Sequence, residues 1–285
     1  MAMADRIQIR VSTHGAELKD LSRAGKEYLW NANPAFWGRT APILFPIVGQ
    51  VADGKYRVGG KEYALSQHGF ARDAEFEPCG ENAFRLVQEA PSEKYPYPFQ
   101  LQVQYETLPE GVNCRWSVKN IGTAPMYFQI GAHPAFLLPE YSPEDPVHGY
   151  FECYNEEGEV INPLAFTCID GGLRSPYPVP KPLGERIPIT EETFLGDALL
   201  IEGSQVTACA LLDKAGKKVL TVESPMAQAF GLWAPHKPGC PFVCIEPWCG
   251  ITDRKGFSGD IAERDLIHRL EPGAAFEFFY KVILA

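Results

Sequence analysis

The sequence lacks the motifs of several common kinds of catalysis. It contains no Gly-rich phosphate loop, no GxSxG motif and no HExxH motif, which argues against nucleotide, acyl-transfer and zincin chemistry. No CxxC pair is present, so zinc clusters and thioredoxin-like redox chemistry have no support. Several of the eight cysteines lie in apolar, strand-like runs, which favours buried free thiols over a disulfide scaffold. The sequence therefore predicts no metal site.

The chain also lacks an excess of positive charge and any long apolar run. Lys and Arg number 26 against 36 Asp and Glu, which gives a formal net charge of −10. A surface of this sign repels phosphate backbones and anionic lipids, so we expect neither nucleic acid nor a membrane as partner. No run approaches 18 apolar residues, and Asp5, Arg6 and Arg10 interrupt the segment where a signal peptide would be apolar. We expect a cytoplasmic protein.

Helical periodicity is scarce as well. The 25 prolines and 26 glycines are spread along the chain and leave little room for long helices. Only GDIAERDLIHRL (259–270) is patterned as a short helix. By contrast, FQLQVQYETL (99–108) alternates between apolar and polar residues, the pattern of a half-buried strand. The segment KYRVGGKEYAL (55–65) predicts a hairpin with Gly59 and Gly60 at its tip.

Many short strands separated by turns predict a large antiparallel β-sandwich with very little helix. A length of 285 residues permits two domains, but all-β sandwiches often reach this length as one unit. The segment 138–190 is rich in proline and glycine, which predicts long loops at the rim of the sandwich. Strand-like patterning has the same character on both sides of it, so we expect a single domain over residues 1–285.

Two of the six histidines lie in contexts that suit a functional site. His68, in SQHGFAR, follows a strand-like segment and precedes a glycine. His133, in QIGAHPAF, ends an apolar run and precedes a proline, which restricts it to extended backbone geometry. Histidine titrates near neutral pH, so each is a candidate for proton transfer. For each, the alternative is a hydrogen-bonded structural histidine.

Two carboxylates lie beside apolar strands. Glu246, in PFVCIEPWCG, follows an apolar run, and Asp197, in TFLGDALLIEG, opens one. Burying a lone carboxylate is costly unless it is paired or used. Apolar neighbours would raise the pKa of Glu246 and allow it to exchange a proton with a hydroxyl. The alternatives are a strand-end carboxylate paired with an arginine for Glu246, and a turn or cap residue for Asp197.

Two arginines complete the set of polar candidates, and two tryptophans lie near this set in the sequence. Arg39 and Arg72 carry guanidinium groups that suit vicinal hydroxyls or phosphate, although each could instead form an ion pair that fixes a loop. Trp37 and Trp248 lie beside the polar candidates, and aromatic faces stack on sugar rings, although most aromatics are simply core. Together, histidines, carboxylates and arginines interleaved with aromatics predict a site that binds a polyol and moves protons on it.

Four segments of the sequence carry a resemblance to a known family. In order, LFPIVGQVADGKYRVGGKEYALSQHGFAR, GAHPAF, FLGDALLI and CIEPWCGITD resemble the aldose 1-epimerase (galactose mutarotase-like) family, in particular its LacX-like branch of bacterial proteins. The resemblance extends from about residue 8 to the final strand. It implies a β-supersandwich that interconverts the α and β anomers of an aldose without a cofactor. An acid protonates the ring oxygen while a base removes the proton of the anomeric hydroxyl.

The resemblance also implies residue roles. His133 resembles the general acid and Glu246 the general base. His68 resembles the second histidine, which holds the substrate, and Asp197 resembles the aspartate that binds sugar hydroxyls. Gln50 stands where typical mutarotases carry a sugar-binding arginine, and this departure puts the usual galactose or glucose specificity in question. Gln50 can hydrogen-bond a hydroxyl but cannot supply charge.

Arg39 and Arg72 resemble arginine positions of the related hexose-6-phosphate epimerases. The expected ligand is therefore a hexose or a hexose phosphate, with Trp248 in the wall of the site and the protein a monomer or homodimer. Two alternatives stay open. One is a non-catalytic carbohydrate-binding protein on the same fold. The other is glycoside hydrolysis by Asp197 and Glu246, which would need their carboxyl groups about 5–9.5 Å apart.

Overall fold

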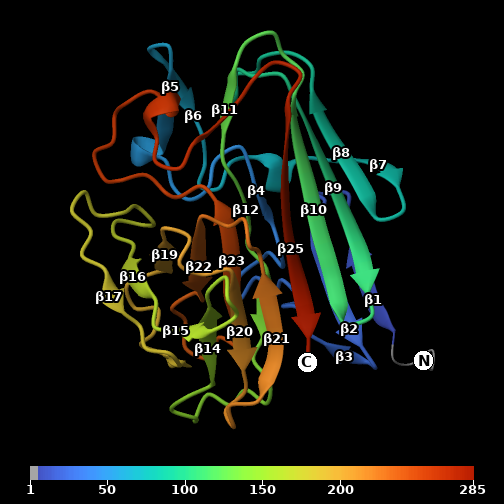
Figure 1. The fold of residues 1–285 in the computed structure, drawn as a ribbon, viewed down its shortest axis with the longest axis vertical. Coiled ribbons are helices and arrows are strands. Elements are labelled where there is room, and N and C mark those ends of the chain that lie inside the picture. The colour runs from blue at the N-terminus through green and yellow to red at the C-terminus, as the bar shows by residue number, and fades with distance from the viewer. Residues whose placement is uncertain (1–5) are drawn as a thin grey trace.

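The computed structural model describes residues 6–285, which are arranged mainly in antiparallel β-sheets. Two large sheets pack face to face, with smaller sheets and long loops around them (Figure 1). The predicted class, a large antiparallel β-sandwich with very little helix, is confirmed. Between residues 6 and 285, no helix is long and apolar enough to cross a membrane.

Within the described residues, the larger sheet has ten strands, of which nine form one path and the tenth, β18, pairs with β14. In spatial order, they are β15 (Val160–Ile161), β14 (Gly149–Tyr154), β20 (Ala208–Leu212), β21 (Lys218–Glu223), β25 (Ala275–Leu284), β10 (Gly111–Asn120), β9 (Phe99–Leu108), β8 (Ala83–Gln88) and β7 (Glu77–Gly80), with β18 (Ile187–Ile189) beside β14.

The second sheet, of eight strands in the same part of the chain, carries most of the candidate site. In spatial order, they are β17 (Lys181–Pro182), β16 (Leu164–Thr167), β19 (Leu199–Glu202), β22 (Ala229–Trp233), β23 (Phe242–Cys249), β12 (Ile130–Ala132) and β4 (Ile43–Leu44), with β13 (Ala135–Leu137) also paired to β23.

Smaller elements surround the two sheets. They are a sheet of β1 (Ile7–Val11), β2 (Leu18–Arg23) and β3 (Lys26–Glu27), the pairs β5 (Lys55–Val58) with β6 (Lys61–Ala64) and β11 (Met126–Phe128) with β24 (His268–Leu270), and the 3-10 turns η2 (Ala52–Gly54), η3 (Ala71–Asp73) and η4 (Ile261–Glu263).

The strand predictions from periodicity are confirmed in detail. The alternating segment 99–108 is β9, in which Phe99, Leu101, Val103 and Tyr105 are buried while the polar side chains are partly or fully exposed. The predicted hairpin is β5 and β6, joined by Gly59 and Gly60 at φ 55° and 82°. Both glycines adopt the left-handed region that a tight hairpin turn requires.

The predicted short helix over 259–270 is wrong. Only η4 forms there, with Asp260 and Glu263 making a reciprocal capping box around a single turn. Beyond it Arg264 is buried, and its Nη1 lies 3.0 Å from Oδ2 of Asp253. Residues 268–270 then pair with β11. Ion pairing and strand pairing with distant segments therefore prevail over the local helical pattern.

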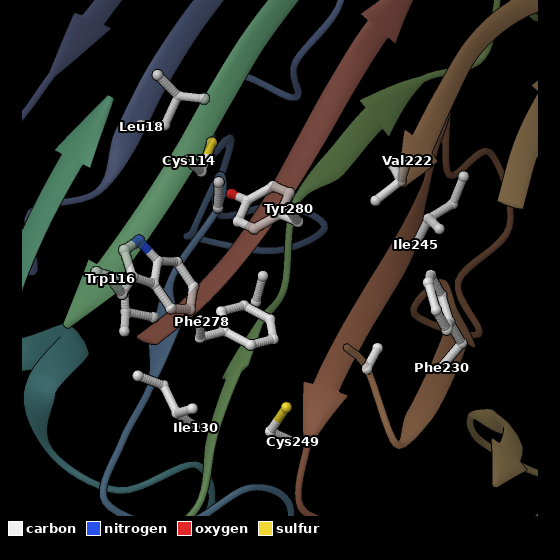
Figure 2. Close-up of a cluster of buried hydrophobic side chains, with 14 of the residues drawn as sticks. Leu18, Cys114, Trp116, Ile130, Val222, Phe230, Ile245, Cys249, Phe278 and Tyr280 are labelled. Carbon is white, nitrogen blue, oxygen red and sulfur yellow. The ribbon is translucent and has the colours of Figure 1, made fainter. Parts of the chain in front are cut away.

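The main core lies between the two large sheets. Figure 2 shows Trp116 and Phe278, from β10 and β25, on one side of this core, and Phe230 and Ile245, from β22 and β23, on the other. All eight cysteines are free and six of them are buried, which confirms the interpretation of buried thiols. The single domain expected over residues 1–285 stays a prediction.

Candidate active site

Strand β23 places Glu246 in the middle of a sheet rather than at a strand end. Alternate residues of β23, including Val243 and Ile245, belong to the main core. Cys244, Glu246 and Trp248 occupy the opposite face, because successive side chains of a strand point to opposite sides. Glu246 is only 1% exposed. The strand is apolar on both faces except at this carboxylate, and the basic group that meets it is a histidine rather than an arginine.

His133 reaches Glu246 because of strand register. Strand β12 pairs with the C-terminal half of β23 and β13 pairs with its N-terminal half, in one continuous register. His133 and Pro134 form the connection between β12 and β13, so the register places His133 opposite Glu246. Directly opposed residues have Cβ atoms about 4.5–5.5 Å apart. The Nε2 atom of His133 accordingly lies 3.2 Å from Oε2 of Glu246.

His68 lies in the loop between β6 and η3 and is fixed by its backbone. It adopts φ 66°, and the next residue, Gly69, adopts φ 74°, where a Cβ atom would meet the carbonyl oxygen of Phe45 at 2.2 Å. The backbone N–H of Gly49 donates to Nδ1 of His68 over 3.0 Å. The neutral ring therefore carries its proton on Nε2 and can donate it. Burial, followed by the charge of His133, lowers the pKa of His68 well below its usual value.

Asp197 and Trp233 form a second pair beside the histidines. Asp197 precedes β19 and adopts φ 74°. The indole Nε1 of Trp233, at the end of β22, donates to Oδ1 of Asp197 over 2.9 Å. The Trp233 ring meets His133 edge-on at 5.4 Å between centroids, and Trp37 stacks on His133 at 4.8 Å. Aromatic rings therefore restrict the imidazole of His133 on two sides.

Most of these side chains line one small cavity. His68, His133, Asp197, Glu246 and Trp248, all predicted from the sequence, are among its lining residues. The remaining lining residues are Gly49, Gln67, Cys168, Gly172, Ala198, Trp233 and Thr252. The fold thus brings together five of the eight predicted site residues, from loops and strands far apart in the sequence.

The other three predicted residues lie outside this lining, as far as the structure describes the chain. Nη2 of Arg39 lies 2.7 Å from Oδ1 of Asp73, so this arginine forms the loop ion pair that was the alternative. Nη2 of Arg72 donates to the backbone oxygen of Gln67 over 2.6 Å. Gln50 is partly buried, and its backbone is hydrogen-bonded to the loop after β23. A direct role of these residues in binding stays a prediction.

Sequence reasoning missed three polar or aromatic lining residues, namely Gln67, Trp233 and Thr252. The Oγ1 atom of Thr252 accepts from the N–H of Gln50 over 2.9 Å and donates to the carbonyl oxygen of Gly172 over 2.6 Å. Thr252 therefore joins three loops at the rim. Trp233 ends an apolar run, a context that gave no indication of its bond to a carboxylate elsewhere in the chain.

The electrostatics of the pair follow from burial. Burial, and then the charge of Asp197, raises the pKa of Glu246 well above its usual value, while the Trp248 side chain opposes the shift. Burial, and then the charge of Arg72, lowers the pKa of His133 to about 3. Both directions favour uncharged groups, as expected in a desolvated site. A neutral imidazole beside a protonated carboxyl group carries the same total number of protons as an imidazolium beside a carboxylate. The two forms differ only in the position of one proton, which the pair shares.

Several polar atoms at the site lack a hydrogen-bond partner among residues 6–285. They are Oε2 of Glu246, Nδ1 of His133 and Nε1 of Trp248. The 3.2 Å contact of Glu246 with His133 is close, but it is not aligned as a hydrogen bond. Buried polar groups are normally paired. Unpaired donors and acceptors grouped in one cavity are typical of a site that binds a polar ligand.

Two facing antiparallel sheets, one of them carrying this cavity, define a galactose mutarotase-like β-sandwich. The family described as aldose 1-epimerase matches residues 2–279. This chain belongs to the aldose 1-epimerase family.

Individual relatives agree with this assignment. The chain is 28% identical over 261 residues to the chromosomal protein LacX of Lactococcus lactis subsp. lactis, covering 86% of each protein. It is similar to the structure of a galactose mutarotase related enzyme from Lactobacillus acidophilus, with a TM-score of 0.88 and 31% identity over 99% of this chain and 95% of that one. A galactose mutarotase-like protein from Lactobacillus casei gives a TM-score of 0.86 and 26% identity over 98% and 97%.

Proposed function

We propose that this protein is an isomerase that interconverts the α and β anomers of a hexose or hexose phosphate. The observation that carries the proposal is the 3.2 Å contact between His133 and Glu246 at the wall of a cavity. Membership of the aldose 1-epimerase family supports the reaction class.

In the proposed mechanism, His133 is the general acid and Glu246 the general base. The carboxylate of Glu246 accepts the proton of the anomeric hydroxyl, while the imidazolium of His133 donates its proton to the ring oxygen. The bond between C1 and the ring oxygen breaks and the aldehyde forms. Rotation about C1–C2 then presents the other face of the carbonyl, and the reverse proton transfers close the ring. The enzyme recovers its protons in each cycle.

The adjacency of the two groups suits this reaction. Ring opening needs an acid that reaches the ring oxygen and a base that reaches the anomeric hydroxyl, and His133 and Glu246 are in direct contact. The anomeric oxygen and the ring oxygen are bonded to the same carbon, so neighbouring side chains can reach both. The reactive ionic form differs from the neutral form only in which of the two side chains holds their shared proton.

The other cavity residues have supporting roles in this proposal. His68 donates a hydrogen bond from Nε2 and steadies charge on the sugar oxygens. Asp197, oriented by Trp233, accepts from sugar hydroxyls. Trp248 forms an apolar wall. Arg39, Arg72 and Gln50 lie outside the cavity lining and are proposed to act at its rim.

Polarimetry of freshly dissolved anomers tests the proposal. We expect the wild-type protein to accelerate mutarotation of at least one aldose or its 6-phosphate over buffer. Glu246→Gln and His133→Asn should each lose about 10²–10⁴-fold in rate, the typical contribution of a general acid or base. Exposed residues provide matched controls, and Glu157→Gln and His14→Asn should retain the wild-type rate.

Two results would contradict the mechanism. One is the absence of acceleration with every aldose tested, and the other is full activity of Glu246→Gln. If calorimetry then showed sugar binding without mutarotation, the chain would be a non-catalytic carbohydrate-binding protein on the same fold. The cytoplasmic location and the monomeric or homodimeric state stay predictions from the sequence.

A further inference from the structure

Three potential metal ligands meet on the site face of β23. A ring nitrogen of His133, Sγ of Cys244 and a carboxylate oxygen of Glu246 all lie within 4.8 Å of one another. Cys244 and Glu246 are two residues apart on one strand, so their side chains share a face. His133 lies opposite Glu246 in the neighbouring strand pair. All three residues are buried, with exposures of 6%, 0% and 1%.

The ligand types and their spacing fit a divalent cation that accepts sulfur. Zinc binds thiolate, imidazole and carboxylate with bonds of about 2.0–2.3 Å, so two ligand atoms of a tetrahedral ion lie about 3.3–3.8 Å apart. Nε2 of His133 and Oε2 of Glu246, which are 3.2 Å apart, already have nearly this spacing, and rotation of the Cys244 side chain would bring Sγ, which lies within 4.8 Å of both residues, into the same range. Three protein ligands leave a fourth tetrahedral position open to water or to a sugar hydroxyl.

Charge balance also favours the ion. A thiolate from Cys244 and a carboxylate from Glu246 together carry two negative charges, and neutral His133 adds none. A dication therefore makes the cluster neutral, which suits a site removed from water. Oε2 of Glu246 is buried and has no hydrogen-bond partner among the described residues, so it is free to act as a ligand.

We propose that His133, Cys244 and Glu246 form a zinc-binding site whose occupation blocks the acid–base pair. The sequence predicts no metal site, because the spacing of Cys240, Cys244 and Cys249 matches no structural metal motif. The spacing of cysteines does not reveal this site, because two of its three ligands are not cysteines and His133 comes from the connection between β12 and β13. On binding, the S–H bond of Cys244 breaks, a zinc–sulfur bond forms, and the thiol proton leaves to solvent.

Occupation of the site has a direct consequence for the proposed reaction. The metal takes the atoms of His133 and Glu246 that would exchange protons with the sugar, so mutarotation stops until the metal is removed. Binding also releases the proton shared by this pair, so the affinity for zinc rises with pH. The inhibition rests on the proposed function, but the binding of zinc does not.

The binding is tested without any assay of activity. Zinc chloride is titrated into the full-length protein by calorimetry, and cadmium chloride is titrated while the thiolate-to-cadmium absorption band is followed in the ultraviolet. The wild-type protein should show one saturable site and a band. Cys244→Ser should lose the band and bind zinc more than ~10–100-fold less tightly, a loss at least as large as that for a residue that only supports a ligand.

Cys240→Ser is the matched control, because Cys240 is a neighbouring thiol outside the three-residue cluster. It should behave as the wild-type protein does. Equal zinc affinity in Cys244→Ser and wild-type protein, or no saturable site in the wild type, would overturn the metal site. If Cys244→Ser does not fold, Glu246→Gln is measured in its place. Unchanged zinc affinity in Glu246→Gln would also overturn the metal site.

Activity is measured separately. Zinc should inhibit mutarotation in competition with sugar, a chelator should restore the rate, and Cys244→Ser should be less sensitive relative to its own metal-free rate. Zinc binding without inhibition would overturn the blocking role alone. A wild-type protein with no mutarotation would contradict the proposed function, while the cadmium band would still decide whether the metal site exists.

Discussion

At the scale of single residues, Glu246 is the proposed general base, and its burial costs free energy of folding. Its side chain is 1% exposed, and Oε2 has no hydrogen-bond partner in the described part of the chain. Burial raises the pKa of Glu246 above its usual value, so the folded protein holds this proton at pH values where the unfolded chain has lost it. Folding therefore becomes less favourable through this group as the pH rises above about 4.5.

This linkage predicts that Glu246→Gln stabilises the fold while it removes activity. A raised carboxyl pKa contributes stability below the unfolded-state value, and that contribution is lost as the pH rises toward the folded-state value. Glutamine has no such dependence. In chemical denaturation, the free energy of unfolding should therefore be nearly equal for the two proteins near pH 4.5. At pH 8 it should be higher for the variant by about 0.5–2 kcal/mol.

The matched control for this prediction is Glu157→Gln, since Glu157 is exposed. The free energy of unfolding of Glu157→Gln should stay within about 0.5 kcal/mol of the wild-type value at both pH values, as for most surface substitutions. A Glu246→Gln variant that is less stable than wild type at pH 8 would show that the carboxyl group stabilises the fold. The main role of Glu246 would then be structural.

At the scale of elements, strand periodicity was a reliable guide and local helical pattern was not. The alternation of residues 99–108 depends only on one face being buried, so it could be read from the sequence. The segment 259–270 has a helical pattern and a capping box, yet it forms one turn because Arg264 pairs with Asp253. That contact depends on a loop after another strand, which local pattern does not describe.

The contact between His133 and Glu246 shows a similar limit. Each residue was a candidate because it lies beside an apolar run, and their approach follows from the register of β12 and β13 on β23. A register between distant segments cannot be derived from either segment alone. Trp233 and Thr252 were missed for the same reason, because their partners, Asp197 and Gly172, lie in other loops.

The loop after β23 is fixed by a buried arginine. Arg174 is 2% exposed, and its Nη1 lies 2.8 Å from Oε2 of Glu202, while Nη2 contacts Asp265. Its Nε donates to the carbonyl oxygen of Thr252 over 3.1 Å. Since Thr252 lines the cavity, Arg174 positions the cavity rim from outside the cavity lining.

Arg174→Met should therefore affect both stability and substrate binding. Breaking a buried ion pair costs about 3–5 kcal/mol, and we expect less, about 1–3 kcal/mol, because the carboxylates of Glu202 and Asp265 are 32% and 40% exposed. Thermal and chemical denaturation measure this loss. Because Thr252 is displaced and the acid–base pair is not, KM should rise more than kcat falls in polarimetric assays.

Arg254→Met is the matched control for this prediction. Nε of Arg254 also contacts Asp265, at 2.8 Å, but its side chain is 49% exposed. A surface substitution of this kind should change stability by no more than about 0.5 kcal/mol. Equal effects of the two variants, on stability or on KM, would show that burial of Arg174 does not position the rim.

At the scale of the whole molecule, the sandwich unites candidates from distant parts of the chain. His68 lies in a loop, His133 between β12 and β13, Asp197 before β19, and Glu246 within β23. The fold class follows from periodicity and turn residues, and the family resemblance identified the same four positions. The surroundings of the arginines could not be predicted from the sequence, because an arginine that forms an ion pair and an arginine that binds a ligand have similar sequence contexts.

The arginines and the net charge together predict a preference for uncharged sugars. Arg39 is paired with Asp73, Arg72 donates to a backbone oxygen, and neither is among the cavity lining residues. Glu246 and Asp197 add acidic groups inside the cavity, and the net charge of the chain is −10. A phosphate ester would thus meet repulsion from these acidic groups, while the guanidinium groups of Arg39 and Arg72 lie outside the cavity lining, so kcat/KM for a hexose 6-phosphate should be at least roughly 10-fold below that for the parent hexose.

The salt dependence separates charge repulsion from poor fit. The screening length falls from about 10 Å at 0.1 M salt to about 3 Å at 1 M, so added salt should narrow the difference between phosphate ester and parent sugar. The rate with the parent sugar should not change, since it carries no charge. A preference for the phosphate ester that disappears in Arg39→Met or Arg72→Met would instead identify a phosphate site at the rim. The ion pair of Arg39 with Asp73 would then have to open when substrate binds.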